Sequence, residues 1–268
     1  MKKKLALILA GTAMAAMVLA GCGEKNNASG EDVKTAESVE DKKTFTVGFD
    51  AEYPPYGYMD ENGEYTGFDL ELAEAVCKLE GWELVKKPLN WDSKDMELNS
   101  GSIDCIWNGF TMNGREYDYT FSTPYVDNSQ VIVVAEKSGI DTLEDLAGKT
   151  VGVQAASAAL DLLQSEEEGG QKKLADTFGA LNEFADYNTA FTELQAGALD
   201  ALAIDVGVAN YQIKSRGEGY KILDETLNTE QYAIGFKKGN QELCDVVNAD
   251  LKKLTEDGTV AKLAEKYE

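Results

Sequence analysis

Arginine is scarce in this chain, and one of its two arginines stands where it could bind an anion. Arg115 and Arg216 are the only two among 25 basic residues, and Arg115 follows a predicted strand that ends at Trp107. A guanidinium group holds a carboxylate through two parallel hydrogen bonds, which a lysine ammonium cannot reproduce. The residues alone leave two alternatives open: a site for a carboxylate, or a structural ion pair with a loop acid such as Glu116 or Asp118.

Asp205 and Ser157 each stand between a predicted strand and a predicted helix. The carboxylate of Asp205 could hold an ammonium group, or it could cap the helix that begins at Val206. The hydroxyl of Ser157 could likewise cap its helix, or the free N–H groups at that helix start could receive a carboxylate. Both residues therefore remain candidates for either role.

Other polar and aromatic residues follow predicted strands, and ligands of open α/β sheets bind at the carboxyl ends of strands. The aromatic members could form apolar walls of a site or belong to the core. These further candidates are Asp50, Tyr53, Trp91, Asn108, Gly109, Thr111 and Gln154.

The composition excludes several kinds of chemistry. The chain has no histidine, which removes Ser-His-Asp and Cys-His nucleophiles and the usual zinc ligand sets. Apart from Cys22, the cysteines are Cys77, Cys105 and Cys244. An odd number cannot all pair, so buried free thiols are favoured, although a bridge from Cys77 to Cys105 stays open. We predict no catalytic residue, no metal and no cofactor.

The elements that position these residues alternate between strands and helices, which indicates α/β construction. A possible capping box, Asp141 with Glu144, precedes a short helical turn. The predicted strands are 44–49, 82–85, 103–107, 149–153, 201–204 and 231–236. The predicted helices are 70–79, one from Ser157, 188–196, 206–214, 241–255 and a last one that ends at Tyr267.

A ten-residue pattern occurs twice. Residues 97–106 and 193–202 both read as a helix end, a glycine and a strand, and Thr-Val-Gly precedes each copy at residues 46–48 and 150–152. This suggests two βαβ lobes with the same local architecture, although a helix followed by a glycine and a strand is also a common sequence pattern in general. The C-terminal segment from the predicted strand at 231–236 onward has no counterpart in the repeat. If this segment returns to the first lobe, the chain passes between the lobes twice and forms a hinge beside a cleft.

The N-terminal region indicates export. Lys2 to Lys4 precede an apolar run at residues 5–20, which predicts a signal peptide. The junction at Leu19-Ala-Gly-Cys22 is similar to a lipobox, so we expect lipidation of Cys22, with an incidental cysteine as the alternative. Residues 23–43 hold almost no large apolar side chain and predict a flexible tether. The formal net charge of −23 makes nucleic acid a poor partner and favours a solvated surface.

The region from about Lys43 to Glu268 resembles the extracellular binding proteins of polar amino acid ABC transporters, solute-binding protein family 3. The segments that carry the resemblance are Gly67-Phe-Asp-Leu-Glu-Leu-Ala73, Gly109-Phe-Thr-Met112 with Arg115, Phe121-Ser-Thr-Pro-Tyr125, Leu143 to Val153, Ile204-Asp205 and Tyr232 to Gly239. The resemblance implies a type II periplasmic-binding-protein-like fold with two lobes and a two-strand hinge. Lobe 1 would span residues 44–126 and 232–268, and lobe 2 residues 127–231.

The same resemblance implies roles for the candidate residues. Arg115 would bind a ligand α-carboxylate with Thr111, Gly109 and Ser157, and Asp205 would take the α-ammonium. Asn108 follows the same predicted strand as Gly109 and Thr111, and Ala156 and Ala158 stand where the family has other small residues. The walls and the side-chain pocket would come from Tyr53, Trp91, Asp50 and Gln154, and the hinge from 125–129 and 230–233.

The implied function is binding of a free amino acid outside the cytoplasm and its delivery to ABC transporter permease subunits. The protein would be a monomer anchored to the membrane by its lipid. Two alternatives are an enzyme on the same scaffold, such as a dehydratase, and a ligand sensor that docks on a membrane receptor.

Overall fold

The structure is a computed structural model that describes residues 39–217 and 219–267. Its first sheet contains five strands, in the spatial order β5 (Glu83–Pro88), β1 (Thr44–Phe49), β6 (Cys105–Ile106), β14 (Gly235–Lys237) and β7 (Tyr119–Phe121). The first three strands run parallel, whereas β14 is antiparallel to both β6 and β7. The last strand in the sequence thus lies inside the sheet built by the first strands.

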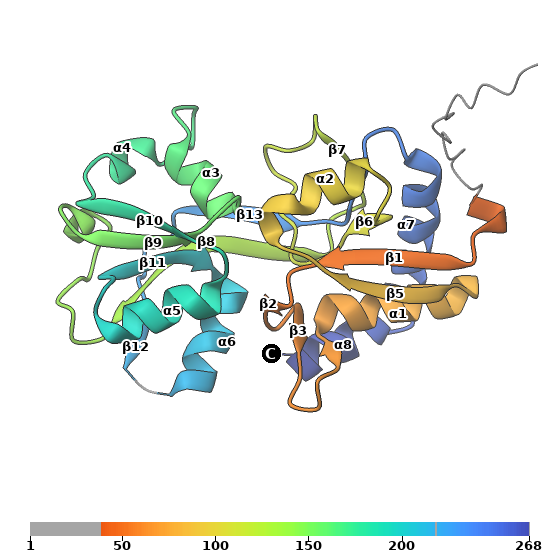
Figure 1. The fold of residues 1–268 in the computed structure, drawn as a ribbon, viewed down its shortest axis with the longest axis horizontal. Helices are drawn as coiled ribbons and strands as arrows, with labels where there is room; N and C mark the ends of the chain where they lie inside the picture. The colour runs from red at the N-terminus through yellow and green to blue at the C-terminus, as the bar shows by residue number, and fades with distance from the viewer. Residues whose placement is uncertain (1–38, 218, 268) are drawn as a thin grey trace, which may run out of the picture. The chain divides into compact units, whose positions relative to one another are not determined.

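The helices of this sheet occupy both of its faces (Figure 1). One face is covered by α1 (Phe68–Glu80), α7 (Gln241–Glu256) and α8 (Thr259–Tyr267), which contact one another, and α2 (Lys94–Asn99) packs against β1. Helix α1 forms because apolar residues recur at helical spacing, and it ends at Gly81 with φ 72°, a left-handed conformation that favours glycine.

The second sheet has the order β10 (Ala180–Phe184), β9 (Thr150–Gln154), β11 (Ala201–Asp205), β8 (Val126–Ala135) and β12 (Tyr220–Ile222). Strand β13 (Asn228–Tyr232) also pairs with β8. The accompanying helices are α3 (Ala158–Gln164), α4 (Lys172–Ala175), α5 (Tyr187–Ala196) and α6 (Val206–Arg216). The fold therefore has the two α/β lobes that the sequence predicts.

Short elements complete the chain. A small antiparallel sheet consists of β2 (Glu52–Tyr53), β3 (Gly57–Met59) and β4 (Tyr65–Thr66). The single-turn 3-10 helices are η1 (Val39–Asp41), η2 (Trp91–Ser93) and η3 (Glu144–Leu146). Strands β2 and β3 follow β1 directly and bring their aromatic residues to the carboxyl end of the first sheet.

The sequence repeat corresponds to a structural repeat. The Asp104 carboxylate accepts a hydrogen bond of 2.7 Å from the backbone N of Thr46, and the Asp200 carboxylate accepts one of 2.8 Å from the backbone N of Thr150. The backbone N of each aspartate donates in return to the carbonyl of the same threonine. In both lobes the same pair of hydrogen bonds thus ties an aspartate to a threonine of an inner strand.

Two predicted elements differ from the structure. The predicted strand at 231–236 is two strands, because β13 ends at Tyr232 beside β8 whereas β14 begins at Gly235 in the other sheet. The predicted capping box is also wrong. Asp145, not Glu144, reaches back and accepts from the backbone N of Asp141 and Thr142. A carboxylate one residue later thus accepts from the N–H group of Asp141, which the predicted box assigns to Glu144.

The predicted signal peptide, Cys22 and most of the predicted tether lie outside the described residues. The last residues of that tether differ from the prediction, since η1 forms at Val39–Asp41 and the Lys42 ammonium lies 2.6 Å from the Asp104 carboxylate. Among the described residues, Cys77, Cys105 and Cys244 are free thiols and are buried. Within the same residues, none of the helices is long and apolar enough to cross a membrane.

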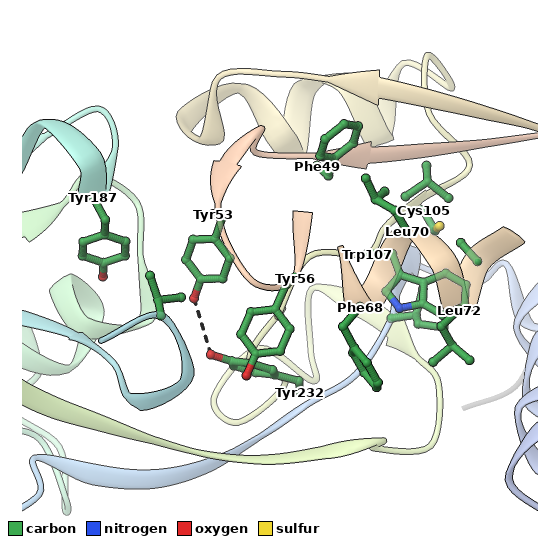
Figure 2. Packing of buried hydrophobic residues seen from close by; sticks show 14 of the residues in the cluster. Phe49, Tyr53, Tyr56, Phe68, Leu70, Leu72, Cys105, Trp107, Tyr187 and Tyr232 are labelled. Carbon is green, nitrogen blue, oxygen red and sulfur yellow. Dashed lines mark hydrogen bonds between the residues drawn. The ribbon is translucent and has the colours of Figure 1, made fainter. Parts of the chain in front are cut away.

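One buried cluster connects the two lobes through tyrosine side chains (Figure 2). The rings of Tyr53 and Tyr187 lie 6.0 Å apart between centroids, and those of Tyr56 and Tyr232 lie 5.2 Å apart. The hydroxyl oxygens of Tyr53 and Tyr232 are 3.4 Å apart. These contacts place the lobes against each other around the residues described next.

Candidate functional site

One cavity gathers nearly all of the residues that the sequence singles out. Its volume is only about 10 Å³, so the walls lie close together. Its lining consists of Tyr53, Trp91, Asn108, Gly109, Thr111, Arg115, Gln154, Ser157, Ala158 and Asp205. Of the predicted residues, only Asp50 lies outside this lining, and Ala158 is an addition.

Arg115 reaches the cavity from the loop between β6 and β7. Its guanidinium carbon lies 5.1 Å from the centroid of the Phe110 ring, and its Nη2 lies 2.6 Å from Oδ2 of Asp161. The predicted alternative of an ion pair with Glu116 or Asp118 is thus wrong, because the partner comes from the first turn of α3 in the other lobe. The Arg115 side chain is only 14% exposed, whereas that of Asp161 is 61% exposed.

Asp205 ends β11 and turns its carboxylate away from the helix that follows. Oδ1 accepts hydrogen bonds of 2.9 Å from Asn128, 2.7 Å from Gln130 and 2.6 Å from the Tyr232 hydroxyl. The predicted capping alternative is therefore not the one realised within the described part of the chain. Burial raises the pKa of Asp205, and these hydrogen bonds act in the opposite direction.

Glu230 is a buried carboxylate that the sequence interpretation included only as part of a hinge range. Its Oε1 accepts a hydrogen bond of 2.7 Å from the Thr111 hydroxyl. It also accepts hydrogen bonds of 2.8 and 2.7 Å from the side-chain amides of Asn128 and Gln130. Burial raises the pKa of Glu230, and the charge of Asp205 raises it further. The alternation of a strand, which puts Glu230 and Tyr232 on one face, could have identified it.

Asp69 is a second buried acid that the sequence interpretation missed. It lies in α1, and its Oδ2 accepts a 2.5 Å hydrogen bond from the backbone N of Gly109. Gly109 has φ 55°, and a Cβ there would lie 2.9 Å from the Tyr53 ring. Burial raises the pKa of Asp69 to about 7. The acid therefore fixes the glycine loop, and an acidic residue between Phe68 and Leu70 was the available signal.

Asp50 and Gln154 meet across the two lobes. The Gln154 side-chain amide donates a hydrogen bond of 2.7 Å to the Asp50 carboxylate and one of 3.1 Å to the carbonyl of Ala185. Burial raises the pKa of Asp50 to about 6. Asp50 lines a neighbouring cavity of about 470 Å³ together with Glu52, Trp91, Glu97, Asp186 and six further residues. This neighbouring cavity is acidic, and Trp91 lines both cavities.

The second lobe contributes the start of α3. The Ser157 hydroxyl accepts a 3.1 Å hydrogen bond from the backbone N of Leu160, so it caps the helix as one alternative predicts. Ala156 has φ 54°, a conformation that favours glycine. Its carbonyl accepts a 3.3 Å hydrogen bond from Lys94 of the first lobe. The backbone here is thus held in a tight turn at the cavity.

Comparison with known proteins gives one family over the whole described domain. The family model described as "Bacterial extracellular solute-binding proteins, family 3" matches residues 45–268. The L-cystine-binding protein TcyJ of Escherichia coli K12 is 30% identical over 257 residues, which are 95% of this chain and 92% of that protein. The arginine-binding extracellular protein ArtP of Bacillus subtilis is 33% identical over 271 residues, which are 100% of this chain and 98% of that protein.

A solved structure has the same architecture. It is an ABC uptake transporter substrate-binding protein from Streptococcus pneumoniae with bound histidine. The two structures superpose with a TM-score of 0.81 at 32% sequence identity, over 85% of this chain and 94% of the other. The family match, these relatives and the two-lobed α/β fold agree. This chain belongs to the bacterial extracellular solute-binding proteins of family 3.

Proposed function

We propose that this protein binds a free amino acid between its lobes and delivers it to the permease of an ABC transporter. The observation that carries the proposal is the pair of opposite charges, Arg115 and Asp205, which line one narrow cavity from different lobes. A guanidinium group suits the α-carboxylate and a buried carboxylate suits the α-ammonium. Thr111, Gly109 and Ser157 lie beside the carboxylate position in this proposal.

The ligand side chain extends toward Asp50 and the acidic neighbouring cavity. Trp91 connects the two cavities and offers an aromatic wall, while Asp50, Glu52 and Asp186 supply negative charge. Such a surface attracts cationic or strongly polar side chains. We therefore expect arginine, histidine or another polar amino acid to bind more tightly than leucine or valine.

The chain divides into lobe 1, residues 44–126 and 232–268, and lobe 2, residues 127–231. The paired strands β8 and β13 join the lobes and would bend when the cleft opens. A ligand that contacts both lobes stabilises the closed state, because it has its full set of contacts only there. In this proposal the protein acts as a monomer outside the cytoplasm, held at the membrane by a lipid on Cys22.

A thermal-shift panel tests the proposal most directly. The protein is heated with each of the twenty standard amino acids and with L-cystine, and a ligand in excess raises the melting temperature by mass action. A shift for one or a few polar amino acids supports the proposal, whereas no shift for any compound contradicts it. Recovery of the ligand unchanged by mass spectrometry distinguishes binding from catalysis, and we propose that the protein is not an enzyme.

A further inference from the structure

The carboxylates of Asp205 and Glu230 share two amide donors. The side-chain nitrogen of Asn128 lies 2.9 Å from Asp205 and 2.8 Å from Glu230, and that of Gln130 lies 2.7 Å from both. Each amide group thus gives one hydrogen to each acid. We propose that Glu230 is a positioning residue of the ammonium site, which shares a proton with Asp205 and releases it when a ligand ammonium binds.

The charge balance of the pair carries the inference. In the described part of the chain the donors that hold the two acids are neutral, namely two amides and the hydroxyls of Thr111, Tyr53 and Tyr232. Two like charges at close range in a buried site cannot both ionise easily, so a pair of this kind keeps one proton beyond the ordinary carboxyl range. The directions of the pKa shifts agree, since those of both Asp205 and Glu230 are raised.

Within the described residues, no cationic group donates a hydrogen bond to either carboxylate of the pair. Among the described residues, the titratable groups that contact the pair are phenols from β2, the β2–β3 turn, α5 and β13, and burial raises the pKa of each phenol and keeps it neutral. Lys94 and Arg115 line a cavity that Glu230 also lines, but the Lys94 ammonium donates to the carbonyl of Ala156. Arg115 lines the same cavity as Asp205, but its Nη2 is paired with Asp161. The phenols are those of Tyr53, Tyr56, Tyr187 and Tyr232.

The proposed exchange balances, and a route for the proton exists. When the ligand ammonium reaches Asp205, the O–H bond of the shared carboxyl breaks and its proton leaves to solvent, so one positive charge replaces another. Glu230 also lines a cavity of about 480 Å³ with Asp127, Asn128 and Val206, and this cavity shares no lining residue with the proposed ligand cavity. The proton can therefore leave without crossing the ligand.

This inference rests on the proposed amino acid site, but its first test needs no ligand. Carboxyl carbons of the labelled protein are titrated by NMR in the wild type and in Glu230→Gln. We expect two coupled steps for Asp205 and Glu230 in the wild type. In the variant we expect a single Asp205 step at lower pH, because the like charge is gone. Independent titration of the wild-type pair in the ordinary carboxyl range would overturn the inference even if the variant does not fold.

The second test uses each ligand found in the panel of amino acids and L-cystine. Calorimetry in two buffers of different ionisation enthalpy counts the protons released. We expect the wild type to release up to one proton on ligand binding. Its Kd should rise about tenfold for each unit by which the pH falls below the pKa of the pair. Glu230→Gln should shift this profile to lower pH, and Glu230→Asp should keep it.

The matched control is Asp224→Asn, which removes an exposed carboxylate and should leave the profile unchanged. A purely structural role of Glu230 predicts weaker binding at every pH with an unshifted profile, and that result would overturn the inference. If no panel compound binds, the proposed function fails, whereas the NMR titration still decides whether the pair shares a proton.

Discussion

The Nη2 atom of Arg115 lies 2.6 Å from the Oδ2 atom of Asp161, across the two lobes. The guanidinium group proposed to hold a ligand carboxylate therefore already has an acidic partner in this structure. Because the Asp161 side chain is 61% exposed, water screens the pair and its net contribution is small, about 0.5 to 1 kcal/mol.

We expect Asp161→Asn to tighten amino acid binding by about two- to fivefold, because it removes a negative charge that competes for the same guanidinium. Isothermal titration calorimetry at low salt measures the change. The control is Glu166→Gln, which removes an exposed acid from the segment between α3 and α4 and should leave the Kd unchanged. Weaker binding in Asp161→Asn would instead show that this ion pair supports the bound state.

Arg115→Lys should weaken binding strongly, since lysine keeps the charge but loses the two parallel hydrogen bonds. The matched control is Arg216→Lys, which changes the other arginine, located over the ring of Phe191 and outside the cavity lining. Calorimetry should show a large loss for the first variant only. Equal affinities of the two variants would refute the proposed carboxylate site.

Asp205→Asn removes the proposed ammonium partner and leaves a ligand charge buried without one. Such a loss costs about 3 to 5 kcal/mol, which takes a micromolar Kd beyond the millimolar range at the upper end. Thermal-shift and calorimetric titrations should detect little or no binding. The melting temperature of the ligand-free variant should stay close to that of the ligand-free wild type. An unchanged Kd would remove Asp205 from the site.

Asp69 should make the stability depend on pH. Its pKa is about 7 in the folded protein against 3.8 in the unfolded chain. Between these values the folded state holds a proton that the unfolded state has lost, so the free energy of unfolding falls as pH rises from about 4 to about 7. Asp69→Asn should flatten this fall, as urea denaturation at pH 4.5 and 7.5 would show.

The control for this pH effect is Asp60→Asn. Asp60 is half-buried in the turn between β3 and β4, and hydrogen bonds from backbone N–H groups lower its pKa, so its removal should leave the fall between pH 4.5 and 7.5 in place. A wild-type slope retained in Asp69→Asn would mean that other buried acids, such as Asp50 with its pKa of about 6, dominate the dependence.

Ala156→Gly should stabilise the protein by about 0.5 to 1 kcal/mol. Ala156 has φ 54°, and the relief of a left-handed alanine exceeds the extra entropy of an unfolded glycine. Ala158→Gly, at the first position of α3, should have the opposite sign, because helical glycine costs up to about 1 kcal/mol. Thermal denaturation of both variants checks the pair, and a loss of stability in both would contradict the strain argument.

Much of the candidate site could be predicted because the fold is an open α/β sheet. Polar residues at the ends of buried strands lie at the carboxyl edge of their own sheet whatever the details of packing, as Asn108 does in the first sheet and Gln154 in the second. The repeat around Asp104 and Asp200 was visible because one local arrangement occurs twice.

What the sequence did not indicate are contacts between segments far apart in the chain. Asp161 is an exposed residue of α3 and resembles any solvated helix position until its distance to Arg115 is known. Glu230 and Asp205 share donors only because β8, β11 and β13 lie side by side. The break between β13 and β14 has the same origin, since a strand leaves one sheet for another without any change in its apolar pattern.

The tyrosine cluster between the lobes has a thermodynamic consequence. Opening of the cleft would wet aromatic rings that are dry in this structure, with Tyr53 at 6% and Tyr56 at 8% exposure and Tyr187 and Tyr232 fully buried. Burial of this aromatic surface when the cleft closes makes the heat-capacity change of ligand binding negative. The enthalpy of ligand binding should therefore become more favourable as the temperature rises. The heat of binding thus reports the closing of the lobes as well as the contacts of the ligand.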